Sequence, residues 1–477
     1  MYRSPIYGNI INGKTKRHWS KLENPIVIWH NFLIKNAVKN NDKVNLRYMI
    51  VFSFDCKILK AYLMIFLMPL MFALPAYADP SIKDNDLVVQ KYVSGICCGP
   101  TTMAFEGNDI FILEKISGEV HVIRNGVFQG TPVLKENVTS DDDQGMLGID
   151  VVGSKVYLYF TESSYNGGPI LGNRVYSYDW DGQHLVNKTL VKALPHFENY
   201  HIGGIMTTDL NGSIYLIVGD YGRFEDNKGG VLENNATGAP DDTGVILRIV
   251  PPGPYYAIGV RNSFGLTVDP VTGRLWDTEN GPDHGDEVNM VLPNFNSGWG
   301  IVAGQANTTQ LAEIPHYQNY VYHDPQFTWD KPVAPTAISF VESNKFPNYN
   351  SSVLVGDCNN GNLYKFELNQ NRDGFVFQSD QLKDKIVNTG ESMDEIVFGT
   401  NFGCLTDIKV GPDGLIYIVS YSDGAIYRIM SKQYLESSQL SESLQYLVYV
   451  VPIVVGIVLF ALYRTRSKKK TMLHSSE

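Results

Sequence analysis

The stretch LTVDPVTGRLWDTEN (residues 266–280) is predicted to form two short strands joined by a tight turn. Apolar and polar residues alternate on both sides of the turn, as they do in strands that bury one face. Between the two strands, Thr272-Gly273 offers a residue that tolerates the positive φ of a hairpin turn. The stretch therefore predicts an antiparallel β-hairpin.

This hairpin pattern recurs along the chain between residues 85 and 430, and no amphipathic pattern of helical period interrupts it. Repeated hairpin units predict an all-β fold and, with four strands per unit, a six-bladed β-propeller. A long β-sandwich or two tandem barrels is the alternative. A propeller carries its functional site in loops at one end of the central channel. The other five units are residues 103–115, 149–162, 206–220, 351–368 and 408–421.

An apolar segment near the start of the chain has the features of a secretory signal. Residues 61–78 (AYLMIFLMPLMFALPAYA) follow two lysines and end in Ala-Tyr-Ala, which predicts cleavage after Ala78. A buried helix or a retained membrane helix is the alternative. We therefore treat residues 1–78 as an N-terminal extension with a signal peptide, and residues 79–432 as the propeller domain.

A second apolar segment lies near the other end. Residues 444–463 (LQYLVYVVPIVVGIVLFALY) contain no charge, and 20 such residues suffice to cross a bilayer as a helix. The basic tail 464–477 follows, which predicts a cytoplasmic C-terminus and an extracytoplasmic propeller. The expected protein is thus a single-pass protein of the cell membrane, with residues 433–443 as the linker.

Charge and cysteine content exclude several classes of protein. The net charge is −11 and the basic residues crowd at the two ends, so the middle of the chain lacks the basic face that nucleic acid binding needs. Dinucleotide, Walker and His-Glu-x-x-His motifs are absent from the sequence. Cys97, Cys98, Cys358 and Cys404 follow the signal and allow three disulfide pairings, among which the sequence does not choose.

Three polar loops are candidates for chemistry. Asp141–Asp143 could bind a metal or form a solvated acidic turn. His201, which precedes two glycines, could accept a proton, although a lone histidine is more often structural. In the third loop, Arg261 could pair with an anionic ligand while the carbonyls of Gly281 and Pro282 face a hard cation; the alternative is that residues 280–283 form only a turn.

Three stretches resemble the soluble quinoprotein glucose/sorbosone dehydrogenase family, also called the aldose sugar dehydrogenases. The resemblance runs over roughly residues 90–430 in the family's order. It implies a six-bladed propeller that uses pyrroloquinoline quinone (PQQ) and Ca²⁺ to oxidise the anomeric carbon of aldoses. The three stretches are YHIGGIMTTDLNGSIYLIVGD, YAIGVRNSFGLTVDPVTGRLWDTENGPDHGDEVNMVLPNFNSGWG and DIKVGPDGLIYIVSYSDGAIYRI.

The resemblance also implies roles for individual residues. His201 would be the general base for the sugar hydroxyl. Arg261 would stabilise the charge that develops on the cofactor. Gln144 and Asn262 would bind the cofactor, and the carbonyls of Gly281 and Pro282 would hold the calcium ion.

The chain departs from the family pattern where the family holds the carboxylates of PQQ. Cys404 and Thr406 stand in place of two arginines, and Asn359 stands in place of a lysine. In addition, Tyr200 replaces an aspartate before the base, and Gln144 is shifted by one position. Each missing charge-assisted hydrogen bond is worth about 1.5–3 kcal/mol, so these departures predict a lower affinity for PQQ.

Two functions follow as hypotheses. The first is a membrane-anchored extracytoplasmic oxidoreductase that oxidises a sugar or related alcohol and passes electrons to an unknown acceptor. The second is a β-propeller binding module, which has lost the cofactor and holds glycans or a protein partner. The retained His201 and Arg261 favour the first hypothesis, whereas Cys404, Thr406 and Asn359 favour the second.

Overall fold

The computed structural model of the chain describes residues 78–196, 198–222, 242–317, 319–440 and 450–460. The expected signal peptide therefore lies outside the described residues except for Ala78. The expected membrane helix 444–463 lies outside them except for residues 450–460.

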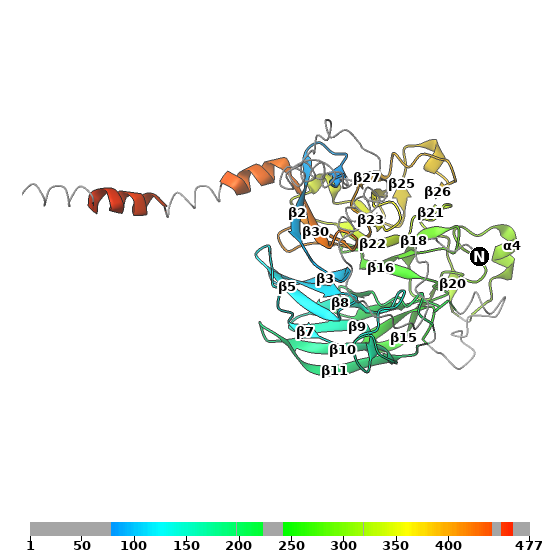
Figure 1. Cartoon of the computed structure of the whole chain (residues 1–477). Helices are drawn as coiled ribbons and strands as arrows, with labels where there is room; N and C mark the ends of the chain where they lie inside the picture. The colour runs from blue at the N-terminus through cyan, green and yellow to red at the C-terminus, as the bar shows by residue number, and fades with distance from the viewer. Residues whose placement is uncertain (1–77, 197, 223–241, 318, 441–449, 461–477) are drawn as a thin grey trace, which may run out of the picture. The chain divides into compact units, whose positions relative to one another are not determined.

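The strands of the described chain form six sheets, each antiparallel at its centre (Figure 1). Three sheets come from the first part of the domain, and their strands are β3 (Pro100–Glu106), β4 (Asp109–Glu114), β5 (Glu119–Arg124), β6 (Val127–Phe128) and β7 (Leu134–Lys135); β8 (Met146–Val152), β9 (Lys155–Ser163), β10 (Ile170–Trp180) and β11 (Leu185–Leu194); and β12 (Met206–Thr208), β13 (Ile214–Val218), β14 (Val245–Val250), β15 (Pro252–Ile258), β19 (Phe295–Asn296) and β20 (Val321–Tyr322).

The other three sheets include both ends of the domain. Their strands are β16 (Ser263–Val268), β17 (Leu275–Glu279), β18 (Asp286–Val291), β21 (Phe327–Trp329) and β26 (Ile386–Val387); β22 (Pro335–Val341), β23 (Ser352–Asp357), β24 (Leu363–Leu368), β25 (Phe375–Val376), β27 (Val397–Thr400) and β1 (Ser81–Ile82); and β28 (Leu405–Val410), β29 (Ile416–Ser420), β30 (Ala425–Ser431) and β2 (Leu87–Ser94). Short helices α4 (Thr308–Glu313), η1 (Pro347–Tyr349) and η2 (Asp380–Leu382) lie in the connections.

The first strand of each sheet contacts the first strand of the next, and the series closes on itself. Strand β3 contacts β8, and contacts continue through β12, β16, β22 and β28 back to β3. A closed ring of inner strands, each at the end of its own sheet, is the arrangement of a β-propeller. The expected all-β propeller is therefore confirmed.

Two strands from the start of the domain complete sheets whose other strands come from its end. Strand β2 pairs with β30 from Leu87↔Ser431 to Ser94↔Ala425, and β1 pairs with β27. These two strand pairs join the start and the end of the domain by backbone hydrogen bonds. The sequence analysis did not anticipate this closure, because hairpin signals report only pairings between neighbouring strands.

All six expected hairpins are antiparallel pairs of strands. The glycine of each turn has positive φ, from 57° at Gly107 to 81° at Gly212. Five hairpins begin on the innermost strand. Unit 351–368 is β23–β24, one strand further out, because the inner strand β22 connects to β23 through the η1 segment rather than a glycine turn.

Apolar side chains fill the spaces between adjacent sheets. Phe111 and Leu113 of β4, for example, are fully buried in one cluster with Met146 and Ile149 of β8. Burial of each large apolar side chain contributes about 1.5–3 kcal/mol, and this packing joins one sheet to the next. The interior around the channel is thus rigid enough to position loops at its mouth.

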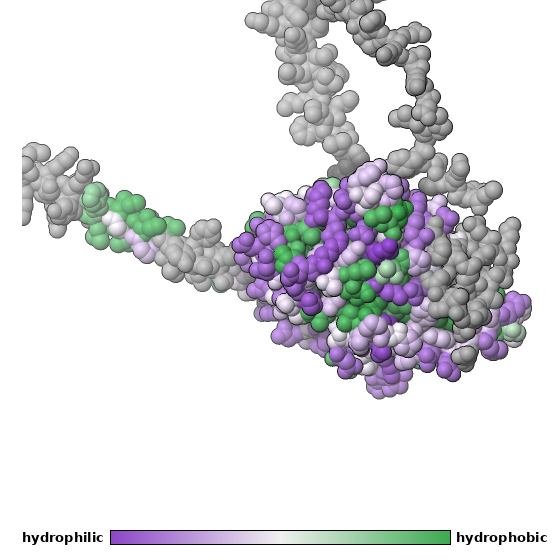
Figure 2. All heavy atoms as spheres, turned by 90° about the horizontal axis from the view of Figure 1, so that it is seen from below, coloured by the Kyte–Doolittle hydropathy of each residue, from purple (hydrophilic) through white to green (hydrophobic). Residues whose placement is uncertain are grey.

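Residues 432–440 and 450–460 are helical. The second of these helices exposes its apolar side chains, and its surface is mostly hydrophobic in Figure 2. No described helix has both the length and the apolar character that a membrane span requires.

Candidate functional site

His201 is fixed at both its backbone and its ring. It follows the exposed Tyr200 and has φ of +51°, and its backbone N–H donates to Asp143 Oδ2 at 2.7 Å. Ring atom Nδ1 lies 2.7 Å from Asp220 Oδ1, and the Asp220 side chain is only 2% exposed. No contact at the other ring nitrogen, Nε2, is found among the described residues. The pair resembles a base oriented by a buried carboxylate.

Asp220 connects His201 to the next loop. Its second oxygen, Oδ2, accepts a hydrogen bond of 2.6 Å from the indole N–H of Trp299. The guanidinium carbon of Arg261 lies 4.9 Å from the centre of the Trp299 ring, within the range of a cation–π contact. His201 and Arg261, which are 60 positions apart in the sequence, therefore belong to one group of side chains.

A glycine allows these loops to approach each other. A Cβ atom at Gly219 would lie 2.2 Å from the carbonyl oxygen of His201 and 2.7 Å from that of Arg261. Both distances are shorter than real Cβ contacts, so only glycine fits between the two carbonyls. Gly219 directly follows β13, and this strand end sets the spacing of the site.

The polar stretch 259–289 is explained by the contacts that hold Arg261. Its backbone N–H donates to Glu279 Oε1 at 2.6 Å, and its Nη1 donates to the carbonyl oxygens of Asn280 at 2.8 Å and Gly281 at 3.1 Å. Glu279 Oε2 accepts from Ser297 at 2.7 Å. The end of β17 thus forms a polar floor beneath the arginine.

Gln144 and Asn262 each have a buried amide oxygen that makes no hydrogen bond among the described residues. Gln144 is fully buried, and its Nε2 donates to Asn199 Oδ1 at 2.8 Å. The backbone oxygen of Asn262 accepts from Asn280 N at 2.8 Å, while its side-chain Oδ1 has no partner among the described residues. A buried acceptor without a donor is unfavourable by about 1–3 kcal/mol, and a bound ligand can remove that cost.

The two predicted calcium ligands, Gly281 and Pro282, differ in their exposure to solvent. The Gly281 carbonyl accepts from Arg261, whereas Pro282 is exposed to solvent. The nearby carboxylate of Asp286 accepts three backbone N–H groups, from Gly281, Val333 and Ala334. The Gly281 carbonyl is shared with Arg261, Pro282 faces solvent, and the Asp286 carboxylate already accepts three hydrogen bonds. Together these groups are a poor ligand set for Ca²⁺.

A cavity of about 330 Å³ adjoins the site through Asp143. Lys115 is the only cation among its lining residues, and it lies beside Asp142 and Asp143. Burial lowers the pKa of Lys115, and its Nζ donates to the Asp142 carbonyl at 2.5 Å. The other lining residues are mainly apolar or uncharged: Thr101, Thr102, Leu147, Ile205, Phe264, Thr336, Cys358, Cys404, Thr406 and Tyr421.

The four cysteines of the domain form the disulfides Cys97–Cys98 and Cys358–Cys404. The second disulfide joins the loop after β23 to the residue before β28, so it ties two neighbouring sheets. It also lines both the cavity beside Asp143 and a separate, more polar cavity of about 620 Å³. Cys404 and Thr406 thus line the first cavity, whereas Asn359 lines the second.

Behind Arg261, three carboxyl groups are buried with raised pKa values. Burial is the largest cause of the rise for Asp277, Glu279 and Glu287, and the charge of a neighbouring carboxylate adds to it for the two glutamates. Their oxygens accept hydrogen bonds from Ser263, Ser297 and the N–H of Gly304. These groups support the loops of the site from below.

The sequence analysis missed Asp220, Trp299 and Lys115. Asp220 ends a strand that reads as ordinary core, and Trp299 lies in a Gly-rich turn, so neither has a local pattern that marks a site. Asp143, considered only as part of an acidic turn, is also the acceptor that holds the His201 backbone. The three aspartates at 141–143 do not form a metal-ligand group among the described residues.

A sequence profile described as Glucose / Sorbosone dehydrogenase matches residues 98–428, which is most of the chain. The chain belongs to the glucose/sorbosone dehydrogenase family. The match covers the strands of the ring together with the His201 and Arg261 loops, so the family resemblance seen in the sequence is confirmed.

Known relatives are distant. The aldose sugar dehydrogenase YliI of Escherichia coli is 23% identical over 51% of this chain and 63% of its own length. The quinoprotein glucose dehydrogenase B of Acinetobacter calcoaceticus is 25% identical over 45% of this chain and 51% of its own length. The chain thus spans between half and two thirds of these two relatives.

Solved structures share the fold. The apo form of the soluble aldose sugar dehydrogenase of Escherichia coli has a TM-score of 0.57 and 18% identity, over 72% of this chain and all of that one. The PQQ-bound aldose sugar dehydrogenase of Streptomyces coelicolor has a TM-score of 0.53 and 21% identity, over 74% of this chain and 98% of that one.

Proposed function

We propose that this chain is an oxidoreductase that oxidises a sugar or a related alcohol, with His201 as the general base. The observation that carries the proposal is the contact of 2.7 Å between His201 Nδ1 and the buried carboxylate of Asp220. That contact places a proton on Nδ1 and leaves Nε2 as the acceptor. The ring can then take the proton of a substrate hydroxyl at Nε2 while Asp220 stabilises the imidazolium that forms.

Arg261 has a second role in this proposal. Its guanidinium is held over Trp299 and against two carbonyl oxygens, which fix its orientation before any ligand binds. A fixed cation in a buried position stabilises negative charge that develops on a bound electron acceptor. Substrate oxidation also needs that acceptor, because the substrate loses two electrons.

PQQ is the acceptor that the relatives suggest, and it supplies a site for hydride when bound. The residues present fit only its reacting end. Arg261 and the amides of Gln144 and Asn262 would face the quinone. For its carboxylates the adjoining cavity offers Lys115 alone, next to Asp142 and Asp143. We therefore propose that the chain binds PQQ weakly.

The remaining parts of the proposal concern architecture and location. We propose that the six sheets are six blades, and that residues 444–463 anchor the chain in the cell membrane with the propeller outside the cytoplasm. The apolar, exposed residues 450–460 support the anchor. Calcium at Gly281 and Pro282 stays a prediction, and chelation with EDTA followed by thermal unfolding tests it.

The deciding experiment is a titration of PQQ into the full-length chain in detergent, followed by a dye-linked assay with a panel of aldoses. Binding with sugar-dependent dye reduction supports the oxidoreductase. Dye reduction at the same rate without sugar, or at the same rate in the His201→Ala variant, contradicts the oxidoreductase proposal.

A second function, a non-catalytic binding module for glycans or a protein partner, is favoured by the Cys358–Cys404 disulfide and Thr406 at the cavity wall. No PQQ binding at about millimolar concentration, combined with binding of immobilised glycans that is unchanged in the His201→Ala variant, would support this function instead.

A further inference from the structure

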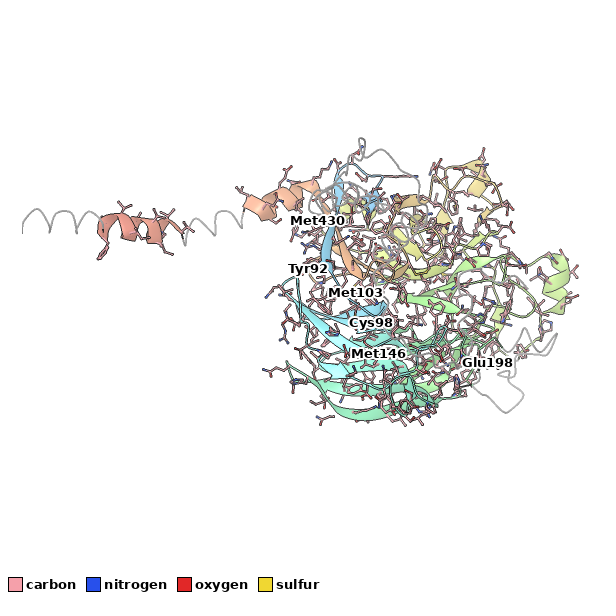
Figure 3. All side chains as sticks on the ribbon, viewed as in Figure 1. Tyr92, Cys98, Met103, Met146, Glu198 and Met430 are labelled. Atoms are coloured by element: carbon pink, nitrogen blue, oxygen red, sulfur yellow. A yellow bond between two sulfur atoms is a disulfide. The ribbon has the colours of Figure 1, made fainter. Side chains whose placement is uncertain are left out.

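A second cluster of reactive side chains lies at the start of β3, apart from the His201 group. Cys98, labelled in Figure 3, stands two residues before this strand. Its carbonyl oxygen accepts from Ile116 N at 3.0 Å, and the Gly99 carbonyl accepts from Lys115 N at 2.9 Å. These bonds hold the two adjacent cysteines against the end of β4, where Glu114 lies.

The sulfur atoms face a buried carboxylate. Glu114 is 1% exposed, and Cys97 Sγ lies 3.4 Å and 3.5 Å from its two oxygens. The ligand atoms of Cys97, Cys98 and Glu114 all lie within 4.8 Å of one another. Two sulfurs and a carboxylate at such spacing can bind a single thiophilic ion.

Glu114 also belongs to a second group with Glu119 and His121. His121 Nε2 lies 3.8 Å from Glu114 Oε1 and 3.2 Å from Glu119 Oε2, and its Nδ1 lies 3.0 Å from the Gln129 carbonyl oxygen. Ser117 Oγ donates to Glu114 Oε2 at 2.8 Å. These contacts orient the carboxylate toward the cysteines, as the outer residues of metal sites orient the ligands.

When Cys97 and Cys98 form a disulfide, the Glu114 carboxylate receives no hydrogen bond from Cys97. A disulfide sulfur has no hydrogen to donate, so the contact between Cys97 and Glu114 brings no hydrogen bond in that state. In the dithiol state Cys97 S–H can donate to Glu114, and with a metal ion present all three groups become ligands. The cluster therefore suits a reduced state better than the oxidised one.

We propose that Cys97, Cys98 and Glu114 form a redox-gated site for a thiophilic divalent cation such as Zn²⁺. Two molecules of a thiol of the glutathione class break the sulfur–sulfur bond by giving together two electrons and two protons, and they are oxidised to one disulfide. The metal then binds as the two cysteine thiols lose their protons. Because Cys97 is exposed, the fourth position of a tetrahedral ion faces solvent and takes water.

The test uses the full-length chain in detergent, reduced with a phosphine and titrated with Co²⁺ and Zn²⁺. The background is the variant Cys56→Ser with Cys358→Ser and Cys404→Ser, so that only Cys97 and Cys98 supply thiolates. We expect one Co²⁺ per chain with a thiolate charge-transfer band that Zn²⁺ abolishes. The same chain, reoxidised with glutathione disulfide, should lose the band.

Substitutions identify the ligands. Cys98→Ser should abolish the band, and Glu114→Gln should weaken Co²⁺ binding at least tenfold. Glu136→Gln is the matched control, because the Glu136 side chain contacts Tyr178 and Lys188 rather than the metal cluster, and it should change affinity less than threefold. Absence of the band in the reduced parent, or an equal band in Cys98→Ser, overturns the proposal. If one variant fails to fold, the comparison of the reduced parent with the reoxidised parent still tests the proposal.

Discussion

Two sides of the candidate site differ in how they are built. The His201 side consists of polar and charged groups that hold one another: His201, Asp220, Trp299 and Arg261 are joined by contacts of 2.6–2.7 Å and one cation–π contact. The opposite side, where Cys358, Cys404 and Thr406 line the cavity, contains a disulfide and a hydroxyl but no charge.

The difference separates two requirements of the proposed chemistry. Proton transfer needs an oriented base, and the first side provides one. Tight binding of a tricarboxylate needs cations, and the second side provides none. A chain with this combination keeps the means of reaction but holds an anionic cofactor weakly, and each prediction below changes one side while leaving the other intact.

The largest effect is expected from His201→Ala. Loss of a general base lowers turnover by about 10²–10⁴-fold, while PQQ binding and the thermal midpoint should change little. The dye-linked assay measures turnover, and calorimetry measures PQQ binding and the thermal midpoint. Asp220→Asn is the companion variant: it should lower turnover and alter the pH profile of kcat, because the amide no longer stabilises the imidazolium. Equal turnover in wild type and His201→Ala would remove the base from the proposal.

The second effect concerns stability on the opposite side. Replacing both Cys358 and Cys404 with serine removes a crosslink between neighbouring sheets, and loss of a native disulfide lowers the free energy of unfolding by about 2–5 kcal/mol. Urea unfolding measures this loss. The comparison predicts that proton transfer from bound substrate survives, since no described contact links this disulfide to His201. A parallel loss of kcat at a temperature where the variant is folded would contradict that separation.

The third change adds a cation to the cavity wall that Cys358, Cys404 and Thr406 form without any charge. Thr406→Arg keeps the disulfide and places a guanidinium at the cavity wall, and one charge-assisted hydrogen bond of about 1.5–3 kcal/mol corresponds to an affinity gain of about 10- to 100-fold. Titration with PQQ measures it. Thr189→Arg, at an exposed position of β11, is the matched control. Unchanged affinity in Thr406→Arg would show that missing cations do not limit PQQ binding.

The hairpins of the propeller ring could be predicted from the sequence because each hairpin depends on neighbouring residues. Glycine turns between alternating strands located all six hairpins, whereas the roles that the family resemblance implies for His201, Arg261, Asn262 and Gln144 stay predictions. What escaped prediction depends on contacts between distant segments. The pairing of β2 with β30, the Asp220 contact to His201 and the disulfide of two cysteines 46 positions apart have no local pattern. Backbone carbonyls leave almost no trace in a sequence, so the calcium ligands Gly281 and Pro282 stay a prediction.

The smallest effect is a pH dependence of stability that originates beneath Arg261. Burial, together with the charge of Asp277, raises the pKa of Glu279 from an ordinary value of 4.5 to about 8. Between these two pH values the folded state holds a proton that the unfolded state has released, so the slope of the free energy of unfolding with pH is negative. The contribution is fully present below about pH 4.5 and is lost as the pH rises to about 8.

Glu279→Gln should therefore flatten this dependence. The amide oxygen can still accept from Arg261 N, and the amide N–H₂ can donate to Ser297 Oγ, so the variant mimics the protonated acid. Between about pH 5 and pH 9 its thermal midpoint should fall a few degrees less than that of the wild type, whereas the exposed control Asp283→Asn should follow the wild type. If the Glu279→Gln variant loses stability with pH as steeply as the wild type, Glu279 is ionised in the folded state, and the floor beneath Arg261 carries a charge that opposes an anionic cofactor even on the His201 side.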